Sequence, residues 1–165
     1  MTAISWDECF MSMAFLAAMK SKDERTQIGA VIVDKKHRLV SQGFNGLPMD
    51  VNDNVPERQI RPEKYFWFEH AERNAIYNAK RDLEGCIMYT NGVPCADCAR
   101  ACIQAGIKEI VVHKQWNLEN INGDWNRSCT VGQQMLEEAG IKIREYNGKI
   151  VNIKCLRAGE PFTLK

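Results

Sequence analysis

Four residues in two short motifs have the types and the spacing needed for metal chemistry. The motifs are His70-Ala71-Glu72 and Pro94-Cys95-Ala96-Asp97-Cys98. Cys95 and Cys98 are three residues apart, so on a helix they share one face, and in its first turn the helix dipole lowers the pKa of a thiol. Two thiolates and one neutral imidazole suit Zn²⁺ and leave one tetrahedral position open for water, which is typical of a catalytic zinc site.

Glu72 has the chemistry of a proton carrier beside such a site. It lies two residues from His70, and at helical spacing the two side chains point in different directions, so Glu72 need not be a ligand. A carboxylate beside an activated water can take the proton of that water and pass it on. We therefore predict His70, Cys95 and Cys98 as metal ligands and Glu72 as the catalytic residue.

Other interpretations of the cysteines compete with this one. A C-x-x-C pair can be a redox dithiol, and a single His is often structural, but their joint occurrence with Pro94 disfavours both. Cys102 could be a fourth ligand of a closed structural site, because it follows Cys98 by four residues. It lies about 6 Å of helical rise beyond Cys98, too far for one tetrahedral ion, so we predict a buried, non-ligating thiol. Core packing is expected for the other cysteines, which are Cys9, Cys86, Cys129 and Cys155.

Helix and strand patterns alternate along the chain, which predicts an α/β fold. Helices are expected over 5–20, 70–80, 94–104 and 130–139, and strands over 27–33, 39–44, 86–89, 109–112, 142–146 and 150–155. Ser5 and Glu8 form a capping box at the start of the first helix. Gly, Pro and Asn recur between positions 45 and 64, which predicts a long loop of the kind that is often functional.

The composition narrows the class of protein. A length of 165 residues predicts a single domain over 1–165, and the net charge of +1 argues against a nucleic-acid polymer as partner. The chain contains no apolar run near the roughly 18 residues that span a membrane. Met1–Glu8 contains no basic region, and the seven cysteines are an odd number, so a secreted disulfide framework is disfavoured. These features predict a cytoplasmic protein without a membrane partner.

At its motifs the sequence resembles the cytidine and deoxycytidylate deaminase family. The resemblance rests on five stretches, 21–33, 43–48, 70–76, 94–99 and 104–109. It implies a cytidine-deaminase-like three-layer fold, with a five-stranded mixed sheet flanked by helices, and a Zn²⁺ cofactor. The GFNGLP loop at 43–48 and Asn74 after the H-A-E motif indicate the branch that acts on dCMP. The implied reaction is hydrolysis of dCMP to dUMP and ammonia, which supplies dUMP for thymidylate synthesis.

The resemblance also implies substrate contacts. Asn45 matches the family's sugar-contacting Asn, although an Asn before Gly46 is also typical of a turn. Arg25 stands where some members bind the phosphate, although it could equally be a solvated surface charge. Lys22 and Lys64 are weaker candidates. Trp116 could stack on a base or on a neighbouring subunit, and a half-buried packing role is the plainer interpretation.

The resemblance weakens after Val112. Family members tend to carry a substrate-contacting, Tyr-containing segment where this chain has HKQWN at 113–117, followed by an extended stretch over 118–127. Many members are hexamers regulated by dCTP and dTTP, which implies a homo-oligomer (dimer or hexamer) and makes dCTP and dTTP candidate effectors. The loop at 49–60 does not match the family's effector loop residue by residue.

Three alternative functions remain open from the sequence. The same chemistry could act on a tRNA or single-stranded polynucleotide, although the near-zero charge disfavours such a substrate. It could act on a free nucleoside, although that group usually has Cys where His70 stands. The chain could also be a zinc-stabilised binding module with no catalytic role.

Overall fold

The centre of the fold is a five-stranded sheet whose strands are short and apolar. A computed structural model describes residues 3–118, 124–151 and 154–163. The sheet has the order β2-β1-β3-β4-β5, in which β1 is antiparallel to both neighbours and β3, β4 and β5 are parallel. The strands are β1 Gly29–Val33, β2 Leu39–Phe44, β3 Ile87–Thr90, β4 Glu109–His113 and β5 Lys142–Tyr146. This topology confirms the predicted mixed sheet.

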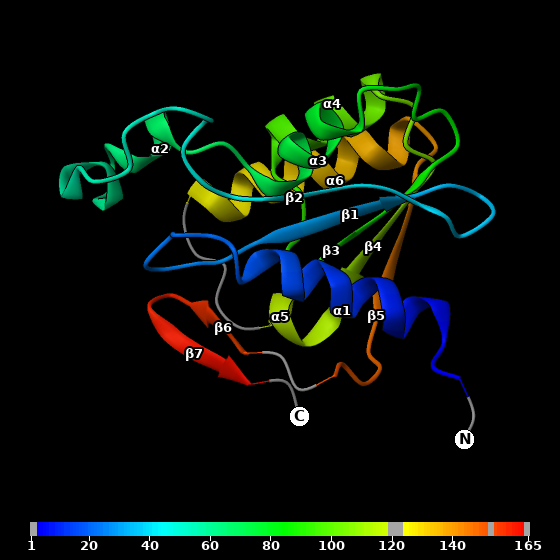
Figure 1. Ribbon diagram of the computed structural model, residues 1–165. Helices are drawn as coiled ribbons and strands as arrows, with labels where there is room; N and C mark the ends of the chain where they lie inside the picture. Colours follow the sequence, from blue (N-terminus) through cyan, green and yellow to red (C-terminus); the bar gives the residue numbers. More distant parts are fainter. Residues whose placement is uncertain (1–2, 119–123, 152–153, 164–165) are drawn as a thin grey trace.

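Helices cover both faces of the sheet, which makes three layers (Figure 1). Helices α1 Trp6–Ala18 and α5 Lys114–Leu118 lie on one face, and α3 Ala71–Ala79, α4 Ala96–Gln104 and α6 Asp124–Glu138 lie on the other. Because successive strand residues point to opposite faces, Ala30 and Ile32 pack with α3 and α4 while Val31 and Val33 pack with α1. All of β1 is therefore buried.

A close approach at Gly43 fixes the position of α3, the helix that begins within the His-Ala-Glu motif. A Cβ on Gly43 would lie 2.4 Å from the Ala71 carbonyl oxygen and 2.3 Å from the Ala75 amide nitrogen. Only glycine lets α3 approach β2 this closely. The position of α3, and with it the motif at its N-terminus, is thus set by the sheet.

Several predicted boundaries differ from the structure. Pro94 lies before the N-cap residue Cys95, so it precedes the helix instead of opening it. The predicted helix over 130–139 begins earlier, at Asp124. In place of one strand over 150–155, the chain forms a hairpin of β6 Lys154–Arg157 and β7 Glu160–Thr163. The turn at Ala158 and Gly159 uses positive φ at both positions, which an apolar pattern alone does not reveal.

The long loop after β2 has little regular structure, as predicted. It contains the 3-10 helix Pro56–Gln59 and leads into the short helix α2 Lys64–Trp67, and this segment projects from one side of the fold (Figure 1). Ser5 accepts a hydrogen bond from the Glu8 amide at 3.1 Å, which confirms the predicted cap of α1. Among the described residues, no helix is both long and apolar enough to cross a membrane.

Candidate active site

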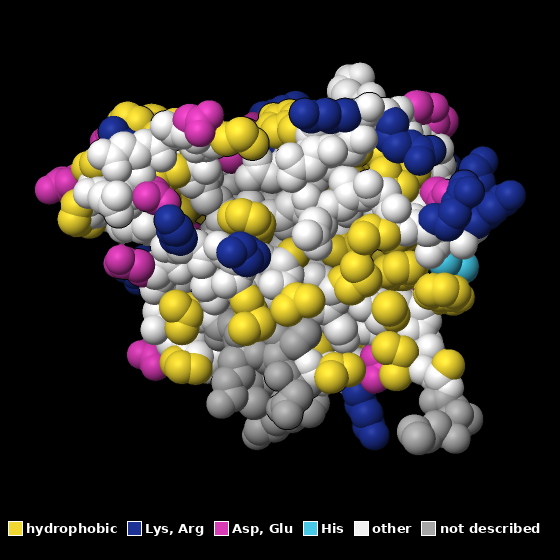
Figure 2. Space-filling view, viewed as in Figure 1, with side chains coloured by type: hydrophobic (Ala, Val, Ile, Leu, Met, Phe, Trp, Pro, Cys, Tyr) yellow, Lys and Arg dark blue, Asp and Glu magenta, His cyan; other side chains and the backbone are white. Residues whose placement is uncertain are grey.

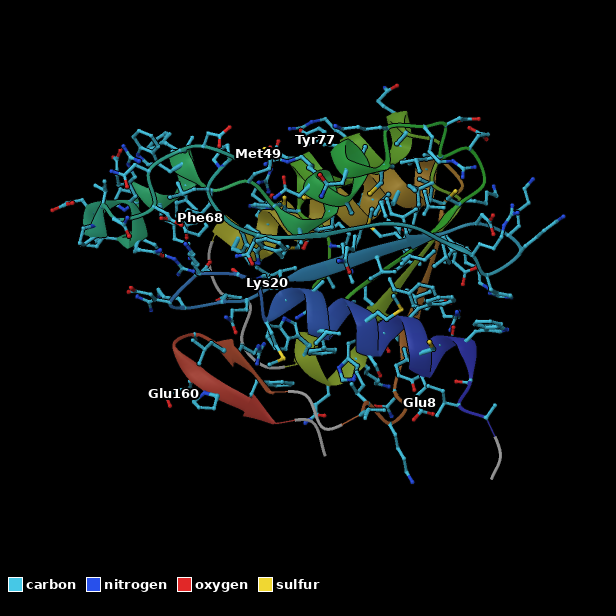
Figure 3. All side chains as sticks on the ribbon, viewed as in Figure 1. Glu8, Lys20, Met49, Phe68, Tyr77 and Glu160 are labelled. Atoms are coloured by element: carbon cyan, nitrogen blue, oxygen red, sulfur yellow. The ribbon has the colours of Figure 1, made fainter. Side chains whose placement is uncertain are left out.

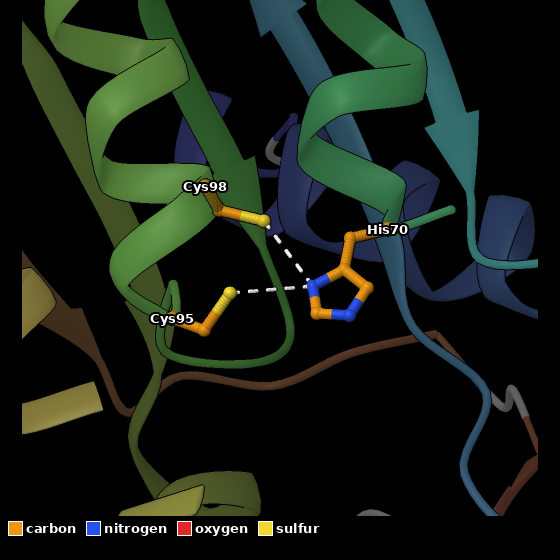
Figure 4. A group of neighbouring side chains, drawn as sticks. All are labelled: His70, Cys95 and Cys98. Carbon is orange, nitrogen blue, oxygen red and sulfur yellow. Dashed lines mark hydrogen bonds between the residues drawn. The ribbon is translucent and has the colours of Figure 1, made fainter. Parts of the chain in front are cut away.

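Three donor atoms converge between two helix N-termini (Figure 4). The Cys95 Sγ lies 3.4 Å and the Cys98 Sγ 3.3 Å from His70 Nδ1, and all three donor atoms lie within 4.8 Å of one another. Both cysteines are buried. The structure thus brings together the three predicted metal ligands, and among the described residues this is the group with metal-binding geometry.

The local sequence explains why these donors stand at helix starts. His70 and Cys95 are the N-cap residues of α3 and α4, both with extended backbone, and neither side chain caps its own helix. The side chains are therefore available to a ligand, while the helix N-terminus favours negative charge on the sulfurs.

Helix α6 holds the cysteine loop in place. The Ser128 hydroxyl accepts a hydrogen bond from the Ala96 amide at 3.2 Å, in the first turn of α4. A Cβ on Gly132 would lie 2.9 Å from the Pro94 carbonyl oxygen, so α6 can pack against this loop only because the residue is glycine. The metal-site geometry thus depends on a helix that carries no ligand.

The electrostatics of the donor group, as well as the residue types, suit a zinc ion. The pKa of Cys95 is lowered, because a hydrogen bond from the Cys98 thiol and one from His70 stabilise its thiolate. The pKa of Cys98 is raised, because the adjacent Cys95 sulfur and burial both oppose a second negative charge. A divalent cation would remove that opposition, so the group suits Zn²⁺ with two thiolates and an imidazole.

Glu72 lies in the first turn of α3, next to the donors. Its side chain is 4% exposed, and burial raises its pKa, partly offset by the positive charge of His70. A carboxyl group with a raised pKa can both accept and return a proton near neutral pH. This environment supports the predicted proton-carrying role, which stays a prediction.

The other cysteines lie outside the donor group. Cys102 is fully buried in the core cluster of α3, α4 and the sheet, and its thiol lies 3.9 Å from the Met88 sulfur. Burial raises its pKa above the ordinary thiol value. This placement agrees with a non-ligating Cys102. Cys86 and Cys129 are also buried, Cys9 is half-buried, and the side chain of Cys155 lies outside the described residues.

A cavity of about 760 Å³ opens beside the donor group. His70 and Glu72 line one end, and the walls come from the loop after β2, from α2, from α5 and from the β6–β7 hairpin. Phe68, at the end of α2, and Glu160, on the hairpin, both line the cavity and lie on the same side of the molecule (Figure 3). Part of the cavity wall is therefore built by segments outside the two motifs.

Two of the four predicted substrate-binding residues line this cavity. Asn45 is buried there, and its amide is hydrogen bonded to Asp23, Thr26 and Ile28. Trp116 is 3% exposed, which is more buried than predicted, and its ring packs edge-on against Phe15 and Phe162. Trp116 therefore forms part of the core as well as of the wall.

The other two predicted residues lie elsewhere. Arg25 and Lys22 are exposed and do not line the cavity, and Lys22 forms an ion pair with Asp53. Three other cations do line it, namely Arg61, Lys64 and Arg157. Arg61 and Arg157 were not predicted because neither belongs to a local motif.

The hairpin that carries Arg157 is attached to the segment before β1. The backbone N–H of Gln27 donates to the Leu156 carbonyl at 3.0 Å. The backbone N–H of Leu156 donates to the side-chain Oε1 of Gln27 at 2.8 Å. The Arg157 guanidinium lies 5.7 Å from the Trp116 ring centroid and 5.8 Å from that of Phe162. These contacts hold a cation at the cavity wall.

Comparisons with known proteins agree with the site. The model of the cytidine and deoxycytidylate deaminase zinc-binding region matches residues 4–114. The chain is 44% identical over 156 residues to the deoxycytidylate deaminase of Homo sapiens, covering 91% of this chain and 84% of the relative. It is 43% identical over 140 residues to a deaminase of Aliivibrio fischeri, covering 84% and 91%.

A solved structure agrees in fold. The dCMP deaminase of cyanophage S-TIM5 superimposes with a TM-score of 0.66 at 23% identity, over 88% of this chain and all of that chain. The predicted fold class is confirmed. From the matched region, the identity over most of both chains and the convergent His-Cys-Cys group, we conclude that the chain belongs to the cytidine and deoxycytidylate deaminase family of zinc-binding enzymes.

Proposed function

We propose that this protein catalyses the zinc-dependent hydrolysis of dCMP to dUMP and ammonia. The observation that carries the proposal is the group of His70 and the buried Cys95 and Cys98 beside Glu72 at one end of a nucleotide-sized cavity. The human relative named deoxycytidylate deaminase, similar over most of both chains, supports dCMP as the substrate. The dUMP formed is the precursor that thymidylate synthesis consumes.

The chain's own residues would divide the chemistry between them. His70, Cys95 and Cys98 would hold the zinc ion, which when bound supplies a Lewis acid that activates water. Glu72 would accept the proton of the water that attacks C4 of the cytosine and deliver it to N3. It would then transfer a second proton to the amino group as the C4–N bond breaks, so that ammonia leaves and a C4–O bond remains.

The phosphate would bind at the opposite end of the cavity. A nucleotide carries a dianionic phosphate group, and the guanidinium groups of Arg157 and Arg61 line the cavity. We therefore assign phosphate contact to Arg157, with Arg61 as a second cation, in place of Arg25. A guanidinium suits bidentate contact with phosphate oxygens.

The proposal also concerns the domain organisation, the oligomeric state and the cellular location of the protein. Residues 1–165 would act as one deaminase domain, because segments from both ends of the described chain line one cavity. Exposed apolar side chains lie on the face shown in Figure 2, and Leu16 of α1 and Leu39 of β2 are among the exposed apolar residues, which supports a homo-oligomer. A cytoplasmic location and regulation by dCTP or dTTP stay predictions.

A substrate panel tests the proposed function. The zinc-loaded protein should convert dCMP faster than deoxycytidine or a cytosine-containing oligonucleotide, measured by ammonia release. The Glu72→Gln variant should keep its zinc and lose about 10²- to 10⁴-fold in kcat, the range for removal of a general acid–base. Turnover of the oligonucleotide without turnover of dCMP would favour the polynucleotide alternative, and an unchanged kcat in Glu72→Gln would contradict the mechanism.

A further inference from the structure

Four hydrogen-bond donors converge on one buried carboxylate beside the cavity. Asp23 Oδ1 accepts from the Arg25 amide at 2.8 Å and the Thr26 amide at 3.0 Å. Its Oδ2 accepts from Asn45 Nδ2 at 2.8 Å and lies 2.5 Å from Lys64 Nζ. The Asp23 side chain is only 2% exposed, so its charge is balanced by these donors and not by water.

Lys64 places a positive charge against the buried carboxylate of Asp23. Its side chain is 8% exposed, which is rare for lysine and implies a fixed partner. Lys64 reaches Asp23 from the first turn of α2, after the long loop. The pair thereby joins that loop to the segment before β1.

Asp23 in turn dictates which way the Asn45 amide points. The Asn45 Nδ2 group donates to Asp23 Oδ2 and to the Thr26 carbonyl at 2.9 Å, which uses both of its hydrogens. The Asn45 Oδ1 accepts from the Ile28 amide at 2.8 Å. Rotating the amide by half a turn would place Oδ1 against the carboxylate and would break all three bonds. Only the carbonyl oxygen, which has two lone pairs, retains hydrogen-bonding capacity.

We propose that Asp23, held by Lys64, is a positioning residue that makes Asn45 an acceptor-only contact for the substrate. This inference rests on the proposed function. Asn45 lines the cavity, and the single sugar hydroxyl of dCMP is the 3′-OH. The 3′-OH donates its hydrogen to Asn45 Oδ1, so a substrate must carry a donor at that position.

Wild-type protein tests the direction of this hydrogen bond without any substitution. Three nucleotides are compared by kcat/KM: dCMP, 2′,3′-dideoxycytidine monophosphate, and its 3′-fluoro analogue, whose fluorine cannot donate. Both analogues should fall about tenfold below dCMP, the upper value for one neutral hydrogen bond. A fluoro analogue turned over as well as dCMP would overturn the inference, whereas absence of any dCMP turnover would overturn the proposed function instead.

A variant tests the role of Asp23. In Asp23→Asn the side chain keeps its shape but no longer imposes one orientation on the Asn45 amide. The preference for dCMP over the dideoxy analogue should shrink from about tenfold to about twofold, mainly through KM. A merely structural role would lower the activity on both nucleotides equally and leave that preference unchanged, which would contradict the proposal.

The chain offers a matched control. Asp34 also accepts two backbone N–H groups on Oδ1, from Lys36 and Arg38, and an Arg38 side-chain N–H on Oδ2, but it lies in the turn after β1 and does not line the cavity. Asp34→Asn should keep the tenfold preference. If Asp23→Asn fails to fold, Lys64→Gln replaces it and should also reduce the preference; a full preference in a folded Lys64→Gln protein would contradict the role of the pair.

Discussion

The two ends of the cavity are built in different ways. At the metal end, three donors from two helix N-termini lie within 4.8 Å of one another, and each belongs to a short motif. Away from the donors, the cavity wall includes Asn45, Lys64, Trp116 and Arg157, which lie in four separate segments joined by hydrogen bonds, an ion pair and ring contacts. The metal donors are therefore specified by local motifs, whereas the other cavity residues are brought together by packing.

One residue links the two ends. Asn117 Oδ1 accepts from the Val93 amide at 2.9 Å, just before the cysteine loop, and its Nδ2 donates to the His113 carbonyl at 2.7 Å. The wall that carries Trp116 and the loop that carries Cys95 are therefore held in one network. Changes at either end can be compared by whether they alter metal content or substrate affinity.

The largest expected effect is at the metal end. Cys98→Ser should lose zinc and reduce turnover to less than about one thousandth of the parent, because a hydroxyl is a poor replacement for a thiolate ligand. Metal content by mass spectrometry and kcat with dCMP measure this. Full zinc occupancy and activity in Cys98→Ser would contradict the assignment of the ligands.

Cys102→Ser is the matched control for that experiment. The thiol is equally buried but lies outside the donor group. Its replacement should leave zinc stoichiometry unchanged and cost about 1–2 kcal/mol of stability, the penalty for a buried hydroxyl. Loss of zinc in this variant would support the closed structural site.

A smaller effect is expected at His113, which supports the far end. Burial lowers the pKa of His113 to about 4, and its Nδ1 accepts a hydrogen bond from the Trp116 amide at 3.3 Å. The His113 imidazole takes up a proton near pH 6.5 in the unfolded chain and only near pH 4 in the folded chain. This residue therefore contributes no penalty above pH 6.5 and destabilises the fold progressively from pH 6.5 down to 4, by about 3 kcal/mol in total.

Urea unfolding at several pH values tests the His113 prediction. The free energy of unfolding of the parent should fall more steeply below pH 6.5 than that of His113→Gln, which has no titrating group at this position. Acid effects on the zinc ligands are common to both proteins and cancel in the difference. Parallel pH profiles for the two proteins would show that His113 does not stay neutral in the fold.

The smallest expected effect separates the two arginines. Arg157→Gln should raise KM for dCMP about tenfold with little change in kcat, because one charged contact to the phosphate is lost, and should leave turnover of deoxycytidine unchanged. Arg25→Gln should change KM less than Arg157→Gln does, because Arg25 does not line the cavity. The reverse order would favour the assignment made from the sequence.

The elements with a clear local sequence pattern were predicted accurately, and an element without one was not. The strands over 39–44 and 142–146 match the structure at both ends, because their apolar patterns are bounded by turn residues. The β6–β7 hairpin was represented by one misplaced strand, since its turn depends on positive φ at Ala158, which has no strong sequence signal. That error concealed Arg157 as a residue of the cavity.

The sequence by itself determined the metal chemistry of this protein, because the donors and Glu72 sit in short motifs whose spacing on a helix fixes their relative directions. It also located the five strands of the central sheet, because short apolar runs specify buried strands, whereas the five-stranded mixed arrangement was implied by the family resemblance. Only the tertiary structure decided that Asp23 and Lys64 form a buried pair, that the pair orients Asn45, and that Arg157 and not Arg25 lines the cavity. The physical reason is that these contacts join segments far apart in the chain, and their partners are chosen by packing and by burial of charge, not by local spacing.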